Sequence, residues 1–307
     1  MELPWPQVIF IAATMITLPL HIAVLILVMR RRKFTPFHVL VISQGIADVF
    51  SLINYFLVNS LRVSQLCNEF FWINRELIAN YEFRSIYFSM YLRNTGIALM
   101  SLQRYICICQ TGAKINRIIS RMSPVIFAML QWGIGLLMVL PLCQPSFNVT
   151  YEMRATLEPV LVPSLLSLAN TILLTSSTVL LATCIICYVL ILNFIQQNSL
   201  QRTESTRHEV RLCGQIAGLV LAFSVQFMYN GGLYILNSFG QMTVIRSWRM
   251  MGPLVYGFLS CVHPWTCLAF NKEIRDGILA IFRYCFGNKE GTISPAIFTL
   301  SSRSRSE

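Results

Sequence analysis

Charged side chains lie inside several long apolar segments of this chain. Asp48 and Arg93 each fall in the middle of such a segment, and Arg104 lies near the end of the segment that holds Arg93. A charge that deep in a membrane-spanning helix is costly, and it is usually retained for ion pairing, proton or ion relay, or switching. These residues therefore predict electrostatic coupling between helices.

Asp48 and Arg93 are expected at similar depth. Asp48 lies about 18 Å along its segment from Pro36, and Arg93 lies about 16 Å from Arg104, at the rise of an α-helix. Because burial of either charge alone is expensive, we predict an intramembrane ion pair between them. Separate polar partners or water remain the alternative. Such a pair either links an outer pocket to the inner face or only fixes the register of the helices.

His263 and Pro264 lie together in the last apolar segment. A proline inside a helix removes one hydrogen bond and frees a carbonyl, so we place both residues with Asp48 and Arg93 in an intramembrane relay. His21 and His263 show no spacing typical of a metal site or of a nucleophile–base pair. Neither a metal, a cofactor nor an enzymatic activity is therefore expected.

Aromatic and polar residues gather in the halves of four segments that we expect to face outward. Aromatic rings with a few polar tips suit a small, mainly apolar ligand. Core packing and interfacial aromatic belts are the alternative explanation for each residue singly. The candidate ligand-binding residues are Tyr87, Met90, Tyr91, Asn170, Tyr229, Asn230, Tyr234 and Tyr256.

The composition is that of a membrane protein. Of the 307 residues, 55% are hydrophobic and 12% are charged, whereas soluble domains carry roughly 25% charged residues. The net charge of +11 is spread over short loops rather than gathered on one polar domain. Membrane orientation explains that distribution better than binding to nucleic acid, which we do not expect.

Seven apolar segments are long enough to cross a bilayer, which takes about 20 residues. They are expected to be helical because lipid offers no partner for backbone polar groups. The sequence thus predicts an all-α membrane protein with a bundle of seven transmembrane helices. The segments are roughly 7–29, 37–61, 84–108, 122–142, 162–195, 211–237 and 248–270.

Basic residues in the connecting loops predict the orientation of the bundle. Sixteen lie on the side of the C-terminal tail and five on the other side, which places the tail in the cytoplasm and the N-terminus outside. The first segment follows an N-terminus without basic residues, so we expect it to be retained rather than cleaved. Asn148 begins a glycosylation motif in a loop predicted to be outside. Cys67 and Cys143 lie on that same side, and a disulfide between them remains open.

A short amphipathic helix is expected after the seventh segment. Apolar residues at helical spacing between Phe270 and Cys285 predict that it lies in the membrane interface. Cys285 is a candidate for palmitoylation there. Residues 1–285 then form one seven-helix domain with this interfacial helix, and the composition of residues 286–307 predicts a disordered cytoplasmic tail.

Several of these segments resemble known receptors. Ser101-Leu102-Gln103-Arg104-Tyr105 resembles the Asp/Glu-Arg-Tyr end of helix 3 in rhodopsin-like G-protein-coupled receptors, and Ala47-Asp48 resembles their helix 2. The stretches 42–48, 71–76 and 101–106 are more similar to the nematode serpentine chemoreceptors, class V in particular, beside class gamma.

The resemblance implies a chemosensory receptor at the plasma membrane that binds an external small molecule and signals to a heterotrimeric G protein. It implies that Arg104 first holds the inactive state and then engages the G protein. Gln103 departs from the family pattern because it replaces the acidic neighbour of that arginine, and His263 replaces an asparagine in the helix 7 motif. The residues expected to contact the G protein are Arg104, Tyr105, Lys114, Arg117, Arg207 and Arg211.

A membrane transporter or a ligand-gated channel is the alternative function. A transporter is expected to show paired broken helices in two halves and more ionisable groups along a path. An odorant-gated channel of the insect type would keep its N-terminus inside. A test of glycosylation at Asn148 therefore separates the receptor from that channel.

Overall fold

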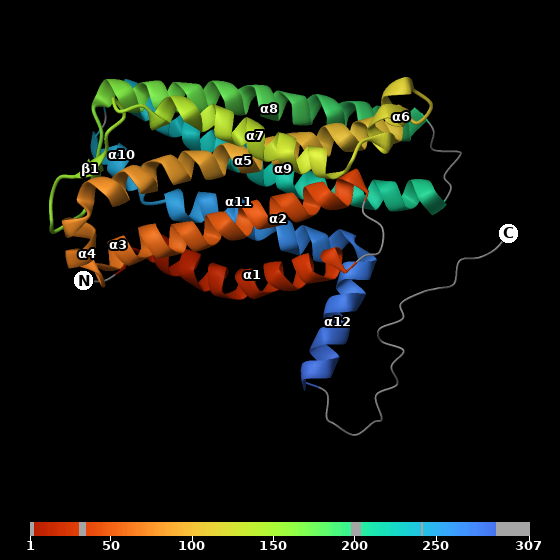
Figure 1. Cartoon of the computed structure of the whole chain (residues 1–307), viewed down its shortest axis with the longest axis horizontal. Coiled ribbons are helices and arrows are strands. Elements are labelled where there is room, and N and C mark those ends of the chain that lie inside the picture. Colours follow the sequence, from red (N-terminus) through yellow and green to blue (C-terminus); the bar gives the residue numbers. More distant parts are fainter. Residues whose placement is uncertain (1–2, 31–34, 198–203, 241, 287–307) are drawn as a thin grey trace.

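The computed structural model is a bundle of helices, and it describes residues 3–30, 35–197, 204–240 and 242–286. Within these ranges, seven long helices run side by side (Figure 1). The predicted all-α seven-helix bundle is confirmed. The helices are α1 (Trp5–Met29), α2 (Pro36–Asn54), α5 (Arg75–Cys109), α7 (Val125–Val139), α8 (Pro163–Gln197), α9 (Glu204–Ser238) and α11 (Gly252–Phe270).

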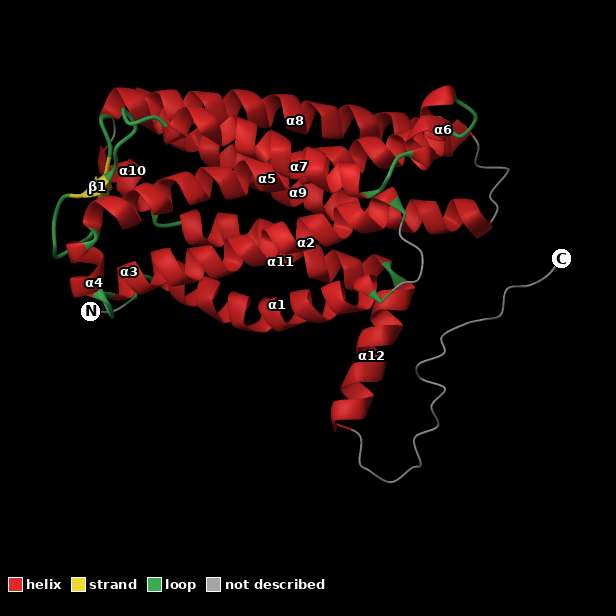
Figure 2. Cartoon of the chain, viewed as in Figure 1, coloured by secondary structure: helices red, strands yellow, loops and turns green. Residues whose placement is uncertain are grey.

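Short elements connect or extend the long helices (Figure 2). A π-helical stretch and a short helix continue α2, and a 3-10 turn continues α7. A two-stranded antiparallel hairpin, β1–β2, pairs Thr150 with Val160 and Tyr151 with Pro159 in the loop before α8. The elements are η1 (Tyr55–Ser60), α3 (Leu61–Ser64), α4 (Asn68–Ile73), α6 (Lys114–Arg121), η2 (Leu140–Cys143), β1 (Thr150–Tyr151), β2 (Pro159–Val160), α10 (Met242–Arg249) and α12 (Lys272–Phe286).

The bundle has the dimensions and composition of a multi-pass membrane protein. Among the described residues, six helical stretches are long and apolar enough to cross a membrane, and each of the long helices except α5 contributes to one of them. α5 lies inside the bundle, where it packs against α2, α7, α8 and α9. The outer helices α7 and α8 bury only 22% of their most apolar windows. Their remaining apolar surface is the one that faces lipid in a membrane.

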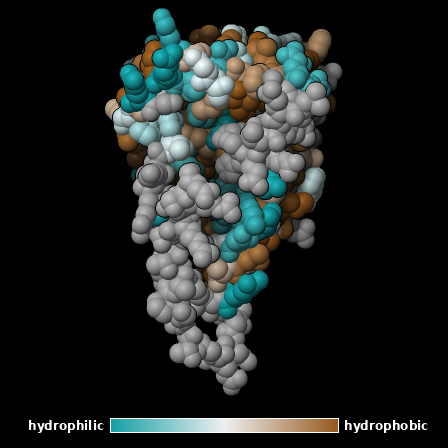
Figure 3. Space-filling model, turned by 90° about the vertical axis from the view of Figure 1, so that its right-hand side faces the viewer, coloured by the Kyte–Doolittle hydropathy of each residue, from teal (hydrophilic) through white to brown (hydrophobic). Residues whose placement is uncertain are grey.

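The two ends of the bundle carry different elements. The start of α1 and the β-hairpin lie at one end, whereas α6 and α12 lie at the other (Figure 1). Figure 3 looks onto the second end, where hydrophilic and hydrophobic side chains are interspersed among the coloured residues. This arrangement is the one that seven crossings of a membrane require.

α12 confirms the predicted helix after the seventh span. It leaves the bundle at a steep angle (Figure 1), so it lies close to the membrane plane when the bundle crosses the membrane. Ile274 and Ile278 are buried, and Leu279 is exposed, as expected of an amphipathic helix at an interface. Cys285 lies within α12. Phe286 closes this helix, and the rest of the predicted tail, residues 287–307, lies outside the described residues.

The predicted boundary of the third span is too late by nine residues, because α5 begins at Arg75 rather than Arg84. The apolar pattern starts only where the helix enters the bundle, but its first turns are polar and contact the outer loops. Glu76 lies in the first turn, where an acidic side chain stabilises the helix dipole.

The Cys67 and Cys143 thiols are both free and exposed in this structure, and a disulfide between them stays an open prediction. Asn80 of α5 makes some of the contacts that hold the outer loop. Its side chain donates to Asn148 Oδ1 at 2.7 Å and to the carbonyl of Val149 at 2.9 Å. The amide of Val149 donates back to Asn80 Oδ1 at 3.1 Å.

Candidate functional site

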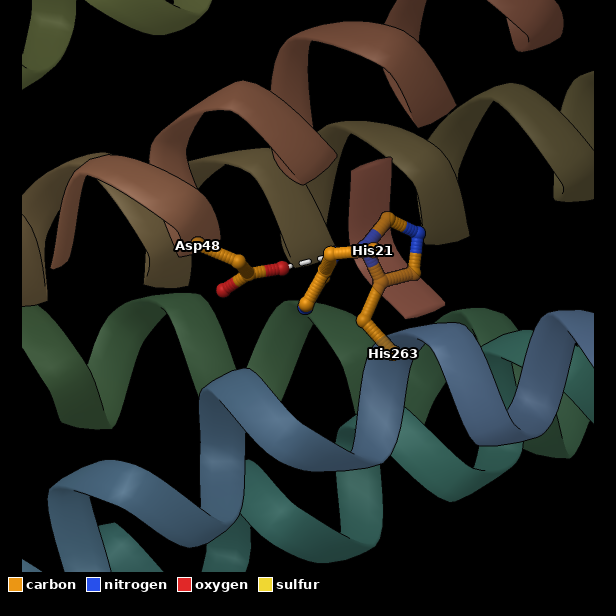
Figure 4. Close-up of side chains that lie close together, drawn as sticks. All are labelled: His21, Asp48 and His263. Carbon is orange, nitrogen blue, oxygen red and sulfur yellow. Dashed lines mark ion pairs between the residues drawn. The ribbon is translucent and has the colours of Figure 1, made fainter. Parts of the chain in front are cut away.

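Three ionisable side chains from three helices meet in the middle of the bundle (Figure 4). They are His21 of α1, Asp48 of α2 and His263 of α11, and each is at most 1% exposed. One candidate ligand atom from each lies within 4.8 Å of the others. His263 Nδ1 and Asp48 Oδ2 are 3.0 Å apart. We call these three residues the mid-bundle cluster.

Pro264 leaves a backbone carbonyl beside the cluster without its helical hydrogen bond. Because proline has no N–H, the carbonyl of Ser260, four residues earlier in α11, loses its usual helical partner. His21 Nε2 lies 2.8 Å from that carbonyl oxygen, and as the partner is an acceptor this nitrogen carries the proton. Pro264 is predicted from the sequence to free a carbonyl, and in the structure that carbonyl, of Ser260, contacts His21.

Several polar atoms of the cluster have no aligned partner. Among the described residues, neither Asp48 Oδ1 nor either ring nitrogen of His263 makes a hydrogen bond of normal geometry. The amide of Gln44 reaches Asp48 Oδ2 only at 3.5 Å, which is beyond the usual range. Buried polar groups are nearly always paired, so this cluster has unused capacity to bind a proton, an ion or water.

The predicted ion pair between Asp48 and Arg93 is wrong. Arg93 Nη1 donates to the carbonyl of Tyr256 at 3.0 Å and to Ser260 Oγ at 2.6 Å. Its Nε donates to the carbonyl of Ser89 within α5 at 3.2 Å. Depth alone suggested the pair, but α11 supplies polar partners to both residues, and Asp48 takes His263 instead.

A chain of amides links the mid-bundle cluster to α7. Gln131 Nε2 donates to Gln44 Oε1 and to the carbonyl of Leu92, each at 3.2 Å. Gly96 of α5 makes room for both glutamines, because an added Cβ there would lie 2.1 Å from Gln44 Oε1 and 2.4 Å from Gln131 Nε2. A larger residue at this position would have to displace the ends of both glutamine side chains.

A small cavity lies beside the cluster, between α1, α2, α5 and α11. Its volume is about 10 Å³, which is close to the lower limit for one water molecule. Only Met90 and Tyr256 of the predicted ligand residues line it. The full lining is Phe10, Ser51, Leu52, Asn54, Tyr55, Ile86, Ser89, Met90, Arg93, Tyr256, Gly257 and Ser260.

Tyrosines among the predicted ligand residues form hydrogen bonds across the bundle. The Tyr87 hydroxyl donates to Asn170 Oδ1 at 2.7 Å, which joins α5 to α8. The Tyr256 hydroxyl donates to Asn230 Oδ1 at 3.0 Å, which joins α11 to α9. A ligand that enters between these helices would have to replace or separate such contacts.

The remaining predicted ligand residues are packed differently. Tyr229 stacks on Trp248 of α10 with ring centroids 6.0 Å apart. Tyr91 is 1% exposed, and its hydroxyl makes no hydrogen bond to a described residue. Tyr234 is partly buried on α9. The structure thus spreads the predicted set over a layer of the bundle rather than around one open pocket.

A second buried cluster ties the outer loops to α5. Arg62 donates to Glu82 Oε1 at 3.2 Å and to the carbonyl of Leu157 at 2.9 Å, and Tyr151 donates to Glu82 Oε2 at 2.7 Å. Burial and the charge of Glu82 raise the pKa of Tyr151, so its hydroxyl remains a donor. We call Arg62, Glu82 and Tyr151 the outer polar cluster. The sequence analysis missed it because it joins residues far apart in the chain.

The opposite end of the bundle carries most of the residues expected to contact a G protein. The guanidinium carbon of Arg104 lies 3.5 Å from the centre of the Phe37 ring, at the start of α2. Lys114 and Arg117 are exposed on α6, and Arg211 is exposed on α9. Tyr105 accepts a hydrogen bond from Gln110 at 3.2 Å. Arg207 lies in α9, and its side chain is outside the described part of the structure.

The comparison with protein families agrees with this architecture. The profile of the serpentine type 7TM GPCR chemoreceptor Srv family matches residues 10–284. The chain belongs to this family. The match spans the described bundle from α1 into α12, so this Srv chain is a multi-pass membrane protein of a receptor family, as its resemblance to nematode serpentine chemoreceptors predicted. No curated protein shows significant similarity to the chain.

The mid-bundle cluster of this Srv chain is not predicted as a unit from the sequence. His21 and His263 show no suitable spacing there, because each residue of the cluster comes from a different helix. A usable signal was present, since His21, Asp48 and His263 each lie near the middle of an apolar segment. Polar residues at one depth in three spans are candidates for contact, whatever their separation along the chain.

Proposed function

We propose that this Srv protein is a plasma-membrane chemosensory receptor that binds an external small molecule and signals to a heterotrimeric G protein. The observation that carries the proposal is the family match over residues 10–284, which covers the same seven helices that form the bundle. The basic loops favour a cytoplasmic C-terminus and an extracellular N-terminus. Residues 1–285 would form the receptor domain, followed by a cytoplasmic tail.

The ligand would enter from the end that carries the β-hairpin. Tyr256, Met90 and Arg93 line the cavity there, and they offer aromatic, apolar and hydrogen-bonding surface to a small, mainly apolar molecule with an acceptor group. Because the cavity holds little more than one water, binding would favour a more open arrangement of α5 and α11. A ligand that binds this arrangement better shifts the population toward it.

The signal would leave at the end that carries α6 and α12. Arg104, packed on Phe37, would be released when α5 and α2 separate, and it would then contact the G protein with Tyr105. Lys114, Arg117, Arg207 and Arg211 would add positive charge to that surface. This basic face suits an acidic or carboxylate-bearing segment of a partner.

The experiment is a screen of volatile and soluble small molecules on cells that express the full chain together with a G-protein reporter. We expect at least one compound to raise the signal in a dose-dependent way, and Arg104→Ala to abolish that response at equal surface expression. An ion current that persists without any G protein would instead favour a ligand-gated channel.

Orientation is tested separately through Asn148, which is exposed. A shift in mobility after treatment with a glycosidase, lost in Asn148→Gln, would place this loop outside the cell. If an accessibility label reaches the Asn148 loop only after the plasma membrane is permeabilised, the proposed orientation is wrong.

A further inference from the structure

We propose that the mid-bundle cluster binds one divalent transition-metal ion of the zinc type through His21, Asp48 and His263. This inference goes beyond the proposed receptor function and does not depend on it. It rests on three observations: the donor set, the geometry of the contacts and the support given to His21.

The donor set consists of two imidazole rings and one carboxylate, all buried. Zn²⁺ is commonly bound by histidine nitrogen and carboxylate oxygen, and three protein ligands leave one position for water or another ligand. Imidazole donors also discriminate against Mg²⁺ and Ca²⁺, which prefer oxygen ligands. The composition of the cluster therefore selects a borderline transition metal rather than an alkaline-earth ion.

The contact between His263 and Asp48 has the geometry of two neighbouring ligands. Nδ1 and Oδ2 are 3.0 Å apart, but the ring nitrogen does not direct a hydrogen bond at the oxygen. Two ligands at about 2.0–2.2 Å from one zinc ion lie roughly 3.3–3.6 Å apart in a tetrahedral site. All three donors already lie within 4.8 Å of one another, so a shift of about an ångström would complete the site.

His21 is held as metal-binding histidines usually are. Its Nε2 lies 2.8 Å from the carbonyl of Ser260, and this contact fixes the ring and leaves the lone pair on Nδ1. A histidine ligand of a metal typically donates its other N–H to a carbonyl or a carboxylate. Pro264 leaves that carbonyl available, so the helix itself provides the outer contact.

Arg93 is a nearby positive charge that would repel a cation bound in this region. Its hydrogen bonds to Ser89, Tyr256 and Ser260 do not use the oxygens of Asp48. Ser51 and Ser260 line the neighbouring cavity and lie one helical turn from Asp48 and His263 respectively.

The test uses the purified full-length chain in detergent, stripped with a chelator and titrated with Zn²⁺ against a competing indicator. We expect one ion per chain in the wild type. In His21→Asn, which leaves the contact between Asp48 and His263 intact, affinity should fall by more than the roughly 10–100-fold that loss of an outer contact costs. His38→Asn is the matched control, because His38 lies at the start of α2, outside the cluster, and it should bind like the wild type.

Thermal unfolding supplies a second readout that does not depend on the indicator. Zn²⁺ should raise the melting temperature of the wild type and of His38→Asn, but not that of His21→Asn or His263→Asn. Each variant is accepted only if it elutes as a monodisperse peak in gel filtration. Absence of stoichiometric binding in the wild type overturns the proposal, and so does binding that survives in a folded His21→Asn.

Discussion

The outer polar cluster and the mid-bundle cluster are both buried, but they differ in how completely their groups are paired. In the outer cluster both carboxylate oxygens of Glu82 accept hydrogen bonds, from Arg62 and Tyr151. In the mid-bundle cluster, Asp48 Oδ1 and the ring nitrogens of His263 have no aligned partner among the described residues.

This difference separates a structural role from a functional one. A fully paired buried network fixes one arrangement of the chain, here that of the loop before α8 on α5. Unpaired buried groups reduce stability, and their retention is expected where a protein needs a site that can bind or switch. We therefore assign the outer cluster to the fold and the mid-bundle cluster to function.

The largest expected effect on stability comes from Glu82→Gln. It leaves the charge of Arg62 buried without its carboxylate, which should lower the free energy of unfolding by about 3–5 kcal/mol. Thermal unfolding in detergent measures the change. The control is Glu69→Gln, because Glu69 pairs with Arg154 on the exposed surface, and its loss should change the stability by less than about 1 kcal/mol. Equal effects of the two variants would contradict the structural role of the outer cluster.

The next effect is expected at Gly96, in the amide chain that leads to the mid-bundle cluster. Gly96→Ala should lower the stability by about 1–3 kcal/mol, because the new Cβ overlaps Gln44 and Gln131. Gly133→Ala on α7 is the control, since an added Cβ there has no neighbour within 4 Å. The control should be neutral or stabilising by up to about 1 kcal/mol. A Gly96→Ala variant as stable as the control would show that the ends of Gln44 and Gln131 move aside at little cost.

The architecture could be predicted from the sequence, but the pairing of the buried charges could not. The seven spans and α12 were predictable because each apolar run in the sequence marks one helix. Asp48 and Arg93 were recognised as buried charges, but their partners depend on how the helices rotate and cross, and no single segment encodes this. Likewise the early start of α5 depends on loop contacts made by Asn80 and Glu82, which have no apolar signature.

A smaller effect is expected at Pro264. Pro264→Ala supplies the missing N–H, so the carbonyl of Ser260 regains a helical partner and its contact with His21 weakens. The free energy of unfolding should change little, whereas the affinity for Zn²⁺ should fall. Titration of the purified variant measures the affinity. Unchanged affinity would show that the outer contact of His21 is unimportant.

The smallest expected effect on stability is at Phe37. Phe37→Leu removes the ring beneath Arg104 and should cost about 0.5–2 kcal/mol. If this contact holds the inactive state, the variant should also raise signalling without ligand in the G-protein reporter assay, at equal surface expression. Unchanged basal signalling would mean that Arg104 is restrained by other contacts.

The central claim is that the outer polar cluster stabilises the fold, whereas the mid-bundle cluster serves function. It is tested most directly by the signal per folded receptor in Glu82→Gln and His21→Asn, measured side by side. Surface-expressed receptor is quantified, and G-protein activation is read with a ligand from the screen. The account predicts that Glu82→Gln lowers the melting temperature but keeps the signal per receptor, while His21→Asn keeps the melting temperature that the wild type has without Zn²⁺ and loses most of the signal. A His21→Asn receptor that is destabilised as much as Glu82→Gln, yet signals normally per molecule, would contradict it.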